Sequence, residues 1–234
     1  MKGHPSLYLA NLFPTLFSLG HYPWILSIGI GILLSLSFPP INASFLSFFG
    51  FIGLYQLVHL SHSYRHLALI SYPAFFVWNL GTTYWLIMAS IPAGIAAIIA
   101  NSAVMLLPMM IIRFIHHRYR LYIWTALFQA ATWVLYEYLH HHWDLAWPWL
   151  SVGNAWANHI SVIQYISVTG HLGISFWVVF GSFLWAHWLH LPEKKGVMAT
   201  GLILSIVLPP LISMISFGLT SEELQKSKGD KIEV

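Results

Sequence analysis

The sequence predicts an all-α, polytopic membrane protein: a bundle of about seven transmembrane helices with the N-terminus in the cytoplasm and the C-terminus outside. Of its 234 residues, 58% are hydrophobic and only 7% are charged, whereas about 25% of the residues are charged in a typical soluble domain. Several segments are long and apolar enough to cross a bilayer core of roughly 30 Å. Because backbone groups in lipid must be hydrogen-bonded within their own segment, these spans are predicted to be helices.

The apolar segments follow one another with short breaks. The first predicted helix ends at Phe38, because Pro39 and Pro40 cannot continue it, and the first two helices are therefore predicted to form a tight hairpin. In chain order, the predicted helices cover residues 24–38, 43–60, 67–90, 92–115, 119–141, 171–190 and 197–217.

The basic residues determine the predicted orientation, because cytoplasmic loops of membrane proteins carry an excess of Lys and Arg. With the N-terminus inside, every Lys and Arg before residue 218 falls on the cytoplasmic side. The opposite loops, at 38–42, around 90 and at 142–170, carry none. The residues predicted to lie inside are Lys2, Arg65, Arg113, Arg118, Arg120, Lys194 and Lys195.

The chain is predicted to have three parts. Residues 1–23 form a cytoplasmic N-terminal segment, residues 24–217 form the membrane domain with an outer loop at 142–170, and residues 218–234 form a polar outer linker. In this linker Gly229-Asp230 predicts a turn, and "KIEV" at the end looks like the opening of a strand. A polar segment that stops as a strand begins suggests that the chain is incomplete.

Glu137 and Asp144 are the only carboxylates before Glu193. Glu137 lies in the last outer turn of its predicted helix, on the same face as Trp133, His140 and His141. An acidic side chain in the middle of a membrane costs roughly 2.5–3.5 kcal/mol, so such residues usually face the interior of the bundle. Two kinds of interpretation stay open: a solvated interfacial Glu137 that helps to orient the loop, or a functional Glu137 that is either a buried anchor for the loop or a contact to a lipid head group.

The outer loop is longer than an ordinary connection, and loops of this length are usually functional or partly structured. Pro148, Gly153 and Asn154 are typical of a folded loop. Residues 159–170 look amphipathic and are expected to lie in the plane of the interface. The tryptophans of this loop suit the interfacial aromatic belt of a membrane protein; they are Trp143, Trp147, Trp149 and Trp156.

The sequence does not predict a metal or another cofactor. Glu137-x-x-His140 is half of a di-iron carboxylate motif, but the second half is missing. The histidine pairs on the inner side lack a His-x-x-His-His box, so these histidines are interpreted as interfacial polar residues; the pairs are His62/His66, His116/His117 and His187/His190. The absence of cysteine excludes disulfides and a thiolate nucleophile within these residues.

Four stretches in this order resemble the membrane half of apolipoprotein N-acyltransferase, in the version found in Bacteroidetes-type bacteria. They are "SLSFPPINASFLSFFGFIGL", "GTTYWL", "WVLYEYLHHHWDLAWPWLSVGNAWA" and "YISVTGHLGISFW". His140 departs from the family pattern, because an Arg is common at that place. The residues that fit the pattern are Trp133, Glu137, Pro148, Trp149 and Gly153.

The resemblance implies an enzyme of the bacterial inner membrane that matures lipoproteins. A periplasmic nitrilase-like domain with a Glu-Lys-Cys triad, followed by an eighth helix, would come after residue 234. That domain would take an acyl chain from a phospholipid as a thioester and pass it to the amino group of the N-terminal, diacylglyceryl-modified cysteine of a lipoprotein. These residues alone would then be inactive, with phospholipid and the lipoprotein as partners and no nucleic acid. The resemblance implies a substrate-side rim or structural loop made of Trp133, Glu137, His140, Trp147, Trp149 and Asn154.

Two other classes stay open from the residues alone. A small transporter or channel would use polar side chains inside the spans, and Asn79, Asn101 and Gln129 are available for this. A membrane scaffold that binds lipid or a partner without catalysis would have the same sequence features.

Overall fold

The computed structural model of the protein describes residues 22–119, 122–190 and 195–229. Within these ranges the chain is helical and contains no strand, so the predicted all-α class is confirmed. The helices are α3 (Pro23–Ser37), α4 (Leu46–Leu60), α5 (Tyr64–Thr83), α6 (Leu86–Ala89), α7 (Ile91–Val104), α8 (Leu106–Arg118), α9 (Tyr122–His141), α10 (Ile166–Leu189) and α11 (Lys195–Gly229). The α9–α10 connection contains three 3₁₀ turns, η2 (Pro148–Leu150), η3 (Val152–Trp156) and η4 (Ile160–Val162).

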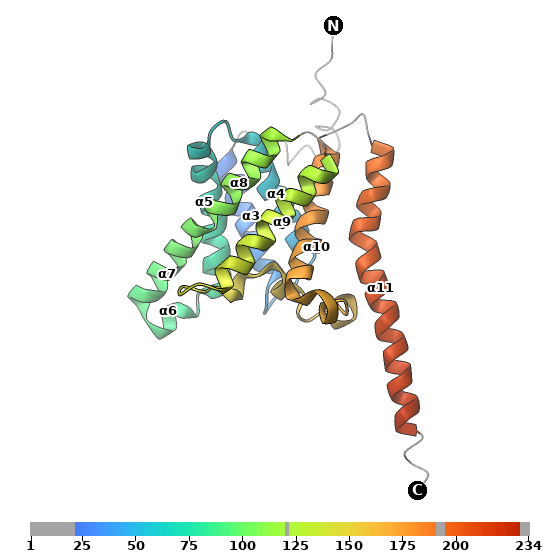
Figure 1. Ribbon diagram of the computed structural model, residues 1–234. Coiled ribbons are helices and arrows are strands. Elements are labelled where there is room, and N and C mark those ends of the chain that lie inside the picture. Colours follow the sequence, from blue (N-terminus) through green and yellow to red (C-terminus); the bar gives the residue numbers. More distant parts are fainter. Residues whose placement is uncertain (1–21, 120–121, 191–194, 230–234) are drawn as a thin grey trace.

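Figure 1 shows these helices as one bundle, with α11 at its side and extending beyond it. The α9–α10 connection and α6 lie together at one end of the bundle, and the α4–α5 turn lies at the other end. By length and composition, three helical stretches of the described part are suited to cross a membrane: Ile91–Arg118, which combines α7 and α8, then Ile166–Leu189 and Ala199–Gly218. α3 and α4 are apolar but shorter, with 15 residues each. The described helices thus form a helical membrane bundle.

Each predicted segment contains a helix, but the boundaries differ in places where proline or glycine interrupts the backbone. The segment 92–115 is divided at Met105 into α7 and α8. Pro108 explains this break. In a continuous helix its ring would clash with the carbonyl of Val104, four residues earlier. The segment 67–90 ends early, at Thr83, and the short helix α6 follows before Pro92 starts α7.

The amphipathic segment 159–170 is not one continuous helix. It contains η4 and the first turn of α10, and α10 bends at Gly170. Gly170 has φ 65° and ψ −179°, a conformation that is essentially restricted to glycine. The main part of α10 therefore begins at residue 171, where the sequence predicted it.

The predicted outer linker starts as a helix. α11 runs for 35 residues to Gly229 and continues past Thr220, where the composition becomes polar. The strand expected at "KIEV" and most of the N-terminal segment 1–23 lie outside the described residues.

The core of the bundle is aromatic and contains Phe51 at its centre. The ring of Phe51 meets Trp133 edge-on at 4.8 Å and lies 6.2 Å from both Trp78 and Phe183. Trp78 and Trp133 are fully buried, and their rings stack at 6.3 Å. These contacts join α4, α5, α9 and α10, and offset and edge-on aromatic pairs are the favoured geometries.

Glycine lets α3 approach its neighbours closely. A Cβ atom on Gly31 would lie 2.6 Å from the carbonyl oxygen of Ala74 in α5, and one on Gly53 of α4 would lie 2.5 Å from the Ile30 side chain. The Ala74 N–H also donates to Ser27 Oγ at 2.9 Å, directly after Pro73. Small residues at helix contacts are the usual means of packing helices in membranes.

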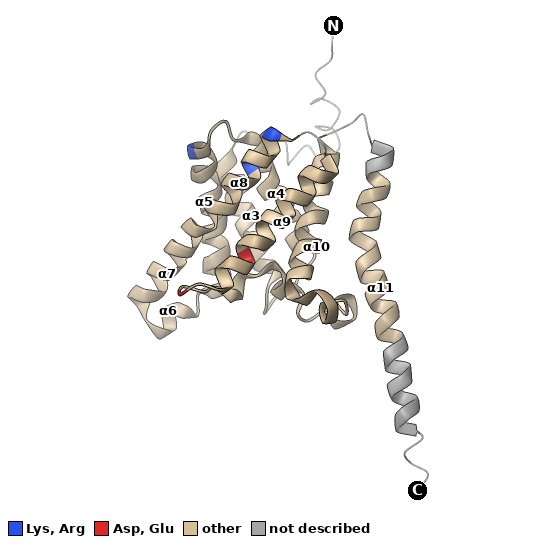
Figure 2. Ribbon diagram, viewed as in Figure 1, with Lys and Arg blue, Asp and Glu red and all other residues tan. Residues whose placement is uncertain are grey.

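The basic end of the bundle is held by Arg113. Its guanidinium donates to the carbonyl and hydroxyl oxygens of Ser61 and lies 5.5 Å from the centre of the Tyr64 ring. Arg113 thus satisfies carbonyls at the end of α4, a favourable place for a cation. Figure 2 shows that the described Lys and Arg positions lie at this end, whereas both acidic positions lie in the other half.

Not all histidines at the basic end lie on the surface. His187 is buried, with Nδ1 2.9 Å from the Tyr55 hydroxyl and Nε2 3.2 Å from Gln129 Oε1. The interpretation of these histidines as interfacial polar residues is therefore wrong for His187, because the ring pairs with polar groups of α4 and α9 inside the bundle. Nε2 of the half-buried His190 similarly lies 2.8 Å from Gln56 Oε1. In the described part of the chain, no three His, Asp or Glu side chains are placed to share a metal ion.

Candidate functional site

The candidate site lies at the acidic end and is called the rim here: the last turn of α9, the chain from residue 142 to η3, and α6. Glu137 is its buried anchor, with only 4% of its surface exposed. Its Oε1 accepts hydrogen bonds from the Trp133 indole N–H at 2.9 Å and from the Val152 backbone N–H at 3.0 Å. Its Oε2 accepts from the Ser151 hydroxyl at 3.3 Å, and Ser175 of α10 lies beside the carboxylate.

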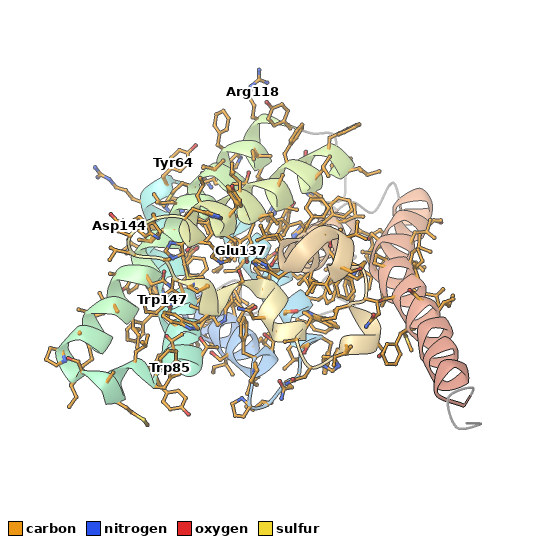
Figure 3. The ribbon with its side chains drawn as sticks, turned by 60° about the horizontal axis from the view of Figure 1, so that its bottom comes forward. Tyr64, Trp85, Arg118, Glu137, Asp144 and Trp147 are labelled. Atoms are coloured by element: carbon orange, nitrogen blue, oxygen red, sulfur yellow. The ribbon has the colours of Figure 1, made fainter. Side chains whose placement is uncertain are left out.

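These bonds make Glu137 the point where α9, η3 and α10 meet. Figure 3 shows Glu137 near the middle of the bundle and Asp144 at its edge. The structure therefore favours the buried anchor over the solvated interfacial acid. A buried carboxylate is stable only when hydrogen bonds replace its water, and here the Trp133 indole, the Ser151 hydroxyl and the Val152 backbone N–H do so.

The backbone of η3 lies directly against α10. The Gly153 N–H donates to Ser175 Oγ at 2.9 Å, and a Cβ atom on Gly153 would lie 2.5 Å from the His171 carbonyl oxygen. Ser175 thus contacts both Gly153 and Glu137. Only glycine allows this close approach without a displacement of one of the two segments.

The other side of η3 is attached to the start of α4. The Ser44 hydroxyl donates to the Ala155 carbonyl oxygen, and the Trp156 indole N–H donates to Ser47 Oγ at 3.3 Å. The Trp156 ring lies 4.8 Å from Trp177 of α10 and 6.0 Å from Phe48 of α4. The middle of the long loop is thus part of the core, and Trp156 is a core residue more than a belt residue.

His140 ends a chain of amide side chains that crosses α5, α7 and α9. Asn79 donates its Nδ2 to the Phe75 carbonyl, Asn101 donates its Nδ2 to Asn79 Oδ1 at 2.7 Å, and Asn101 Oδ1 lies 2.8 Å from His140 Nε2. Because each amide has one donor and one acceptor side, this order leaves Asn101 Oδ1 as an acceptor. His140 must therefore donate from Nε2, and in the neutral ring Nδ1 is left as the acceptor.

The tryptophans of the rim contact one another and α6. Trp149 meets Trp147 and Trp85 edge-on, each at 5.3 Å. Asn154 is half-buried and donates from Nδ2 to the Pro148 carbonyl at 2.8 Å, which closes the turn between η2 and η3. The indole N–H of Trp147 is buried and has no hydrogen-bond partner.

Two hollows meet at the rim. The rim cavity has a volume of about 300 Å³; its lining comes from α6, α7, α9 and the loop, namely Leu86, Ala97, Ala100, Asn101, Val104, His140, Trp143, Asp144, Leu145, Ala146, Trp147 and Trp149. The α8–α9 groove has a volume of about 630 Å³ and is lined by Val104, Leu107, Pro108, Ile111, Thr132, Leu135, Tyr136, Leu139, His140, His142 and Trp143. Val104, His140 and Trp143 line both hollows.

Comparison with known proteins assigns this architecture to a family. Residues 30–184 match the family model described as "Apolipoprotein N-acyltransferase N-terminal domain". The chain belongs to this family. An apolipoprotein N-acyltransferase of Chlorobaculum tepidum is 29% identical over 161 residues, which are 67% of this chain and 30% of the relative. The chain therefore spans about a third of the length of the curated relative that it matches.

The matched region of this apolipoprotein N-acyltransferase domain includes the whole rim. Of the residues that the sequence singled out, Trp133 and Glu137 are hydrogen-bonded to each other in the core, and His140, Trp147 and Trp149 surround the rim cavity. Asn154 lies outside both hollows and closes a turn. Trp133 and Glu137 thus anchor the loop, whereas His140, Trp147 and Trp149 line the cavity.

Sequence reasoning missed the partners of these residues. The Ser151 hydroxyl donates to the Glu137 carboxylate, Ser175 accepts from the Gly153 N–H, and Asn101 orients His140. The signal available for the serines was weak, because small hydroxyl residues are common in membrane helices and usually bond their own helix. Asn101 stood out as a polar residue in an apolar segment, but the sequence could not tell whether it faced a pore or another side chain.

Proposed function

We propose that the chain is the membrane domain of an apolipoprotein N-acyltransferase, which moves an acyl chain from a phospholipid to the N-terminal diacylglyceryl-cysteine of lipoproteins. The observation that carries this proposal is the family match over residues 30–184, the region that contains the Glu137 anchor and both hollows. The domain holds the lipid substrate at the membrane surface, and the rim supports the domain that performs the chemistry.

The chemistry itself belongs to residues outside this chain. Acyl transfer through a thioester requires a cysteine nucleophile, and these 234 residues contain no cysteine. We therefore expect these residues alone to bind substrate without acylating it. A nitrilase-like domain with the Glu-Lys-Cys triad would rest on the rim, after residues 218–234.

The α8–α9 groove is suited to the acyl chain of the lipid. Leu107, Ile111, Leu135 and Leu139 line it, and each of these residues is more than half exposed. Soluble proteins rarely expose so many neighbouring apolar side chains. An alkyl chain that enters from the bilayer exchanges one apolar environment for another and loses little free energy. His140 and Trp143 line both this groove and the rim cavity, so the ester of the lipid would lie beside the rim.

The proposed location is the bacterial inner membrane, with several membrane crossings and the rim on the periplasmic side. This orientation agrees with the separation of charge along the bundle, because the basic positions of the described part lie at the end opposite the rim (Figure 2). Acyl transfer to a secreted lipoprotein requires the rim on this side.

A chimera tests the proposal. Residues 1–234 would be joined to the part of the Chlorobaculum tepidum relative that follows its matching region, and the purified product would be assayed for acyl transfer from phospholipid to a diacylated lipopeptide. We expect acylation by the chimera and none by residues 1–234 alone. A chimera that is folded and stable but inactive, beside an active relative, would count against the proposed function.

A further inference from the structure

A third hollow lies between α4, α10 and α11 and is called the α4–α11 groove here. Its volume is about 370 Å³, and within the described part of the chain no charged residue lines it. The lining is apolar and aromatic; it consists of Phe45, Phe48, Phe49, Trp156, Val162, Trp177, Trp185, Ile206, Val207 and Pro210. None of these residues lines the rim cavity or the α8–α9 groove, so the third hollow is separate from both.

Two of the indole rings in this lining already use their N–H groups inside the protein. Trp156 donates to Ser47 Oγ at 3.3 Å, and Trp177 donates to the Ser205 carbonyl oxygen at 3.1 Å. An occupant of the groove therefore meets the carbon atoms of these rings and not their hydrogen-bond donors. Such a lining is suited to an apolar chain and not to a polar head group.

α11 is attached on the side of α10 and η4, which are its main packing partners. The Ser213 hydroxyl accepts the backbone N–H of Gln164. Pro209 has no N–H, so the Ser205 carbonyl, four residues earlier in α11, loses its helical donor, and Trp177 replaces it. These bonds fix α11 to α10 and η4, and its face toward α4 remains as one wall of the groove.

Gly181 of α10 shows how narrow the groove is where its two walls meet α10. A Cβ atom on Gly181 would lie 3.1 Å from Phe48 of α4 and 3.1 Å from Ile206 of α11, so one added carbon would touch both walls. A helix with its side chains is about 10–12 Å wide and does not fit into such a slot. A polymethylene chain is one carbon wide and does fit.

The surroundings of the groove supply such a chain. Within a bilayer the molecules around a helical bundle are lipids, and their hydrocarbon tails reach the depth of the membrane-spanning helices. A hollow without an occupant would deprive the rings that line it of dispersion contacts on one side. An acyl chain restores these contacts, and its fit to the slot favours it over loosely associated lipid.

We propose that the α4–α11 groove holds one acyl chain of a membrane lipid, which packs α11 against α4. This lipid is a resident part of the bundle and not a substrate, so the inference goes beyond the proposed function. Phe45 and Trp156 lie where the start of α4 meets η3, at the rim end of the bundle. The lipid therefore belongs to the leaflet on the side of the rim.

Photo-crosslinking of the full chain tests this proposal. The chain would be placed in vesicles of phosphatidylethanolamine and phosphatidylglycerol, with a small share of phosphatidylglycerol that carries a diazirine in the middle of one acyl chain. Peptide mass spectrometry after irradiation would compare Phe49 and Val207 in the groove with Ile28 and Ile32, which are exposed on α3. We expect roughly three- to tenfold more label per residue in the groove than on α3.

Variants assign this excess of label to the groove. Gly181→Leu fills it from α10, and Val207→Trp fills it from α11; each should reduce the label in the groove to within about twofold of the label on α3. Gly29→Leu and Leu208→Trp are the matched controls. No atom lies within 4 Å of a Cβ atom on Gly29, and Leu208 is exposed outside the lining.

A thermal melt in detergent verifies that each variant is folded. Val207 is exposed, so its substitution is not expected to unfold the protein and keeps the test valid if Gly181→Leu does not fold. Loss of the excess label in the folded groove variants, with the excess kept in both controls, would support the resident acyl chain.

Equal labelling of the groove and α3 in the unaltered chain would overturn the proposal, and so would an excess that survives in every folded groove variant. An unlabelled groove in a chain that is dimeric in the same vesicles would assign the groove to a second copy instead. The chimera assay asks only whether acyl transfer occurs, so its result and the labelling result are independent.

Discussion

The Glu137 carboxylate in α9 accepts a hydrogen bond from the backbone N–H of Val152 in η3, with Oε1 and the nitrogen 3.0 Å apart. The same oxygen accepts the indole N–H of Trp133, one turn earlier in α9. A single side chain thus fixes a loop backbone to the helix that precedes it. The arrangement explains why an apolar chain keeps an acid at this position although burial of the carboxylate is unfavourable by itself.

Substitution of Glu137 should therefore loosen the rim. Glu137→Ala leaves the N–H groups of Trp133 and Val152 buried without an acceptor, and each unsatisfied buried group costs about 1–3 kcal/mol. We expect a lower melting temperature in detergent and faster proteolysis within residues 142–165. Asp144→Ala is the control, since an exposed surface residue usually changes stability by less than about 0.5 kcal/mol. Equal proteolysis of the two variants would contradict the anchor role.

Gly153 should tolerate no side chain. Gly153→Ala places a Cβ atom 2.5 Å from the His171 carbonyl oxygen, so that η3 or α10 must move, at a cost of about 1–3 kcal/mol. Gly29→Ala in α3 is the matched control, because no atom lies within 4 Å of the added Cβ. There the change should stabilise the helix by roughly 0.5–1 kcal/mol. Thermal melts of both variants measure the contrast, and a Gly153→Ala protein as stable as the control would refute the close contact.

The positions of the helices could be predicted because a membrane span depends on local composition alone. Twenty apolar residues predict a span wherever they pack, and the predicted segments accordingly overlap α3 to α11. The end of the third predicted helix, 67–90, was harder to predict from the sequence. Thr83 and Tyr84 continue an apolar run, and α5 ends there because the chain turns into α6 and the rim.

The candidate site could be predicted only as a list of residues. Glu137 was conspicuous because acids are rare in this chain, but its partners Ser151 and Ser175 are 14 and 38 residues away and belong to other segments. The position of His187 in the core depends on Tyr55, 132 residues earlier. Such pairs result from the packing of helices, which no local pattern of the sequence encodes.

The hydrogen-bonded side chains of Asn79, Asn101 and His140 predict a tautomer of His140 that nuclear magnetic resonance can measure. The Asn101 carbonyl oxygen faces His140 Nε2, so the proton of the neutral ring should reside on Nε2. Asn101→Ala removes this acceptor and should let the proton divide between the two ring nitrogens. The nitrogen-15 chemical shifts of the His140 ring report the tautomer, with Asn154→Ala as the control because Asn154 bonds only within the loop. An unchanged tautomer in Asn101→Ala would mean that another group orients the ring.

The direction in which the rim faces can be measured directly, because the chain contains no cysteine and any introduced thiol is the only one present. Asp144 and Arg118 are both exposed. Arg118 ends α8 at one end of the bundle, and Asp144 belongs to the α9–α10 connection at the other end (Figure 1). In intact cells, a membrane-impermeant maleimide should label the Asp144→Cys variant, whereas the Arg118→Cys variant should react only after the membrane is permeabilised. The unaltered chain is the control for background. The reverse pattern would put the rim in the cytoplasm, where no secreted lipoprotein could reach it, and acyl transfer at this rim would then be impossible.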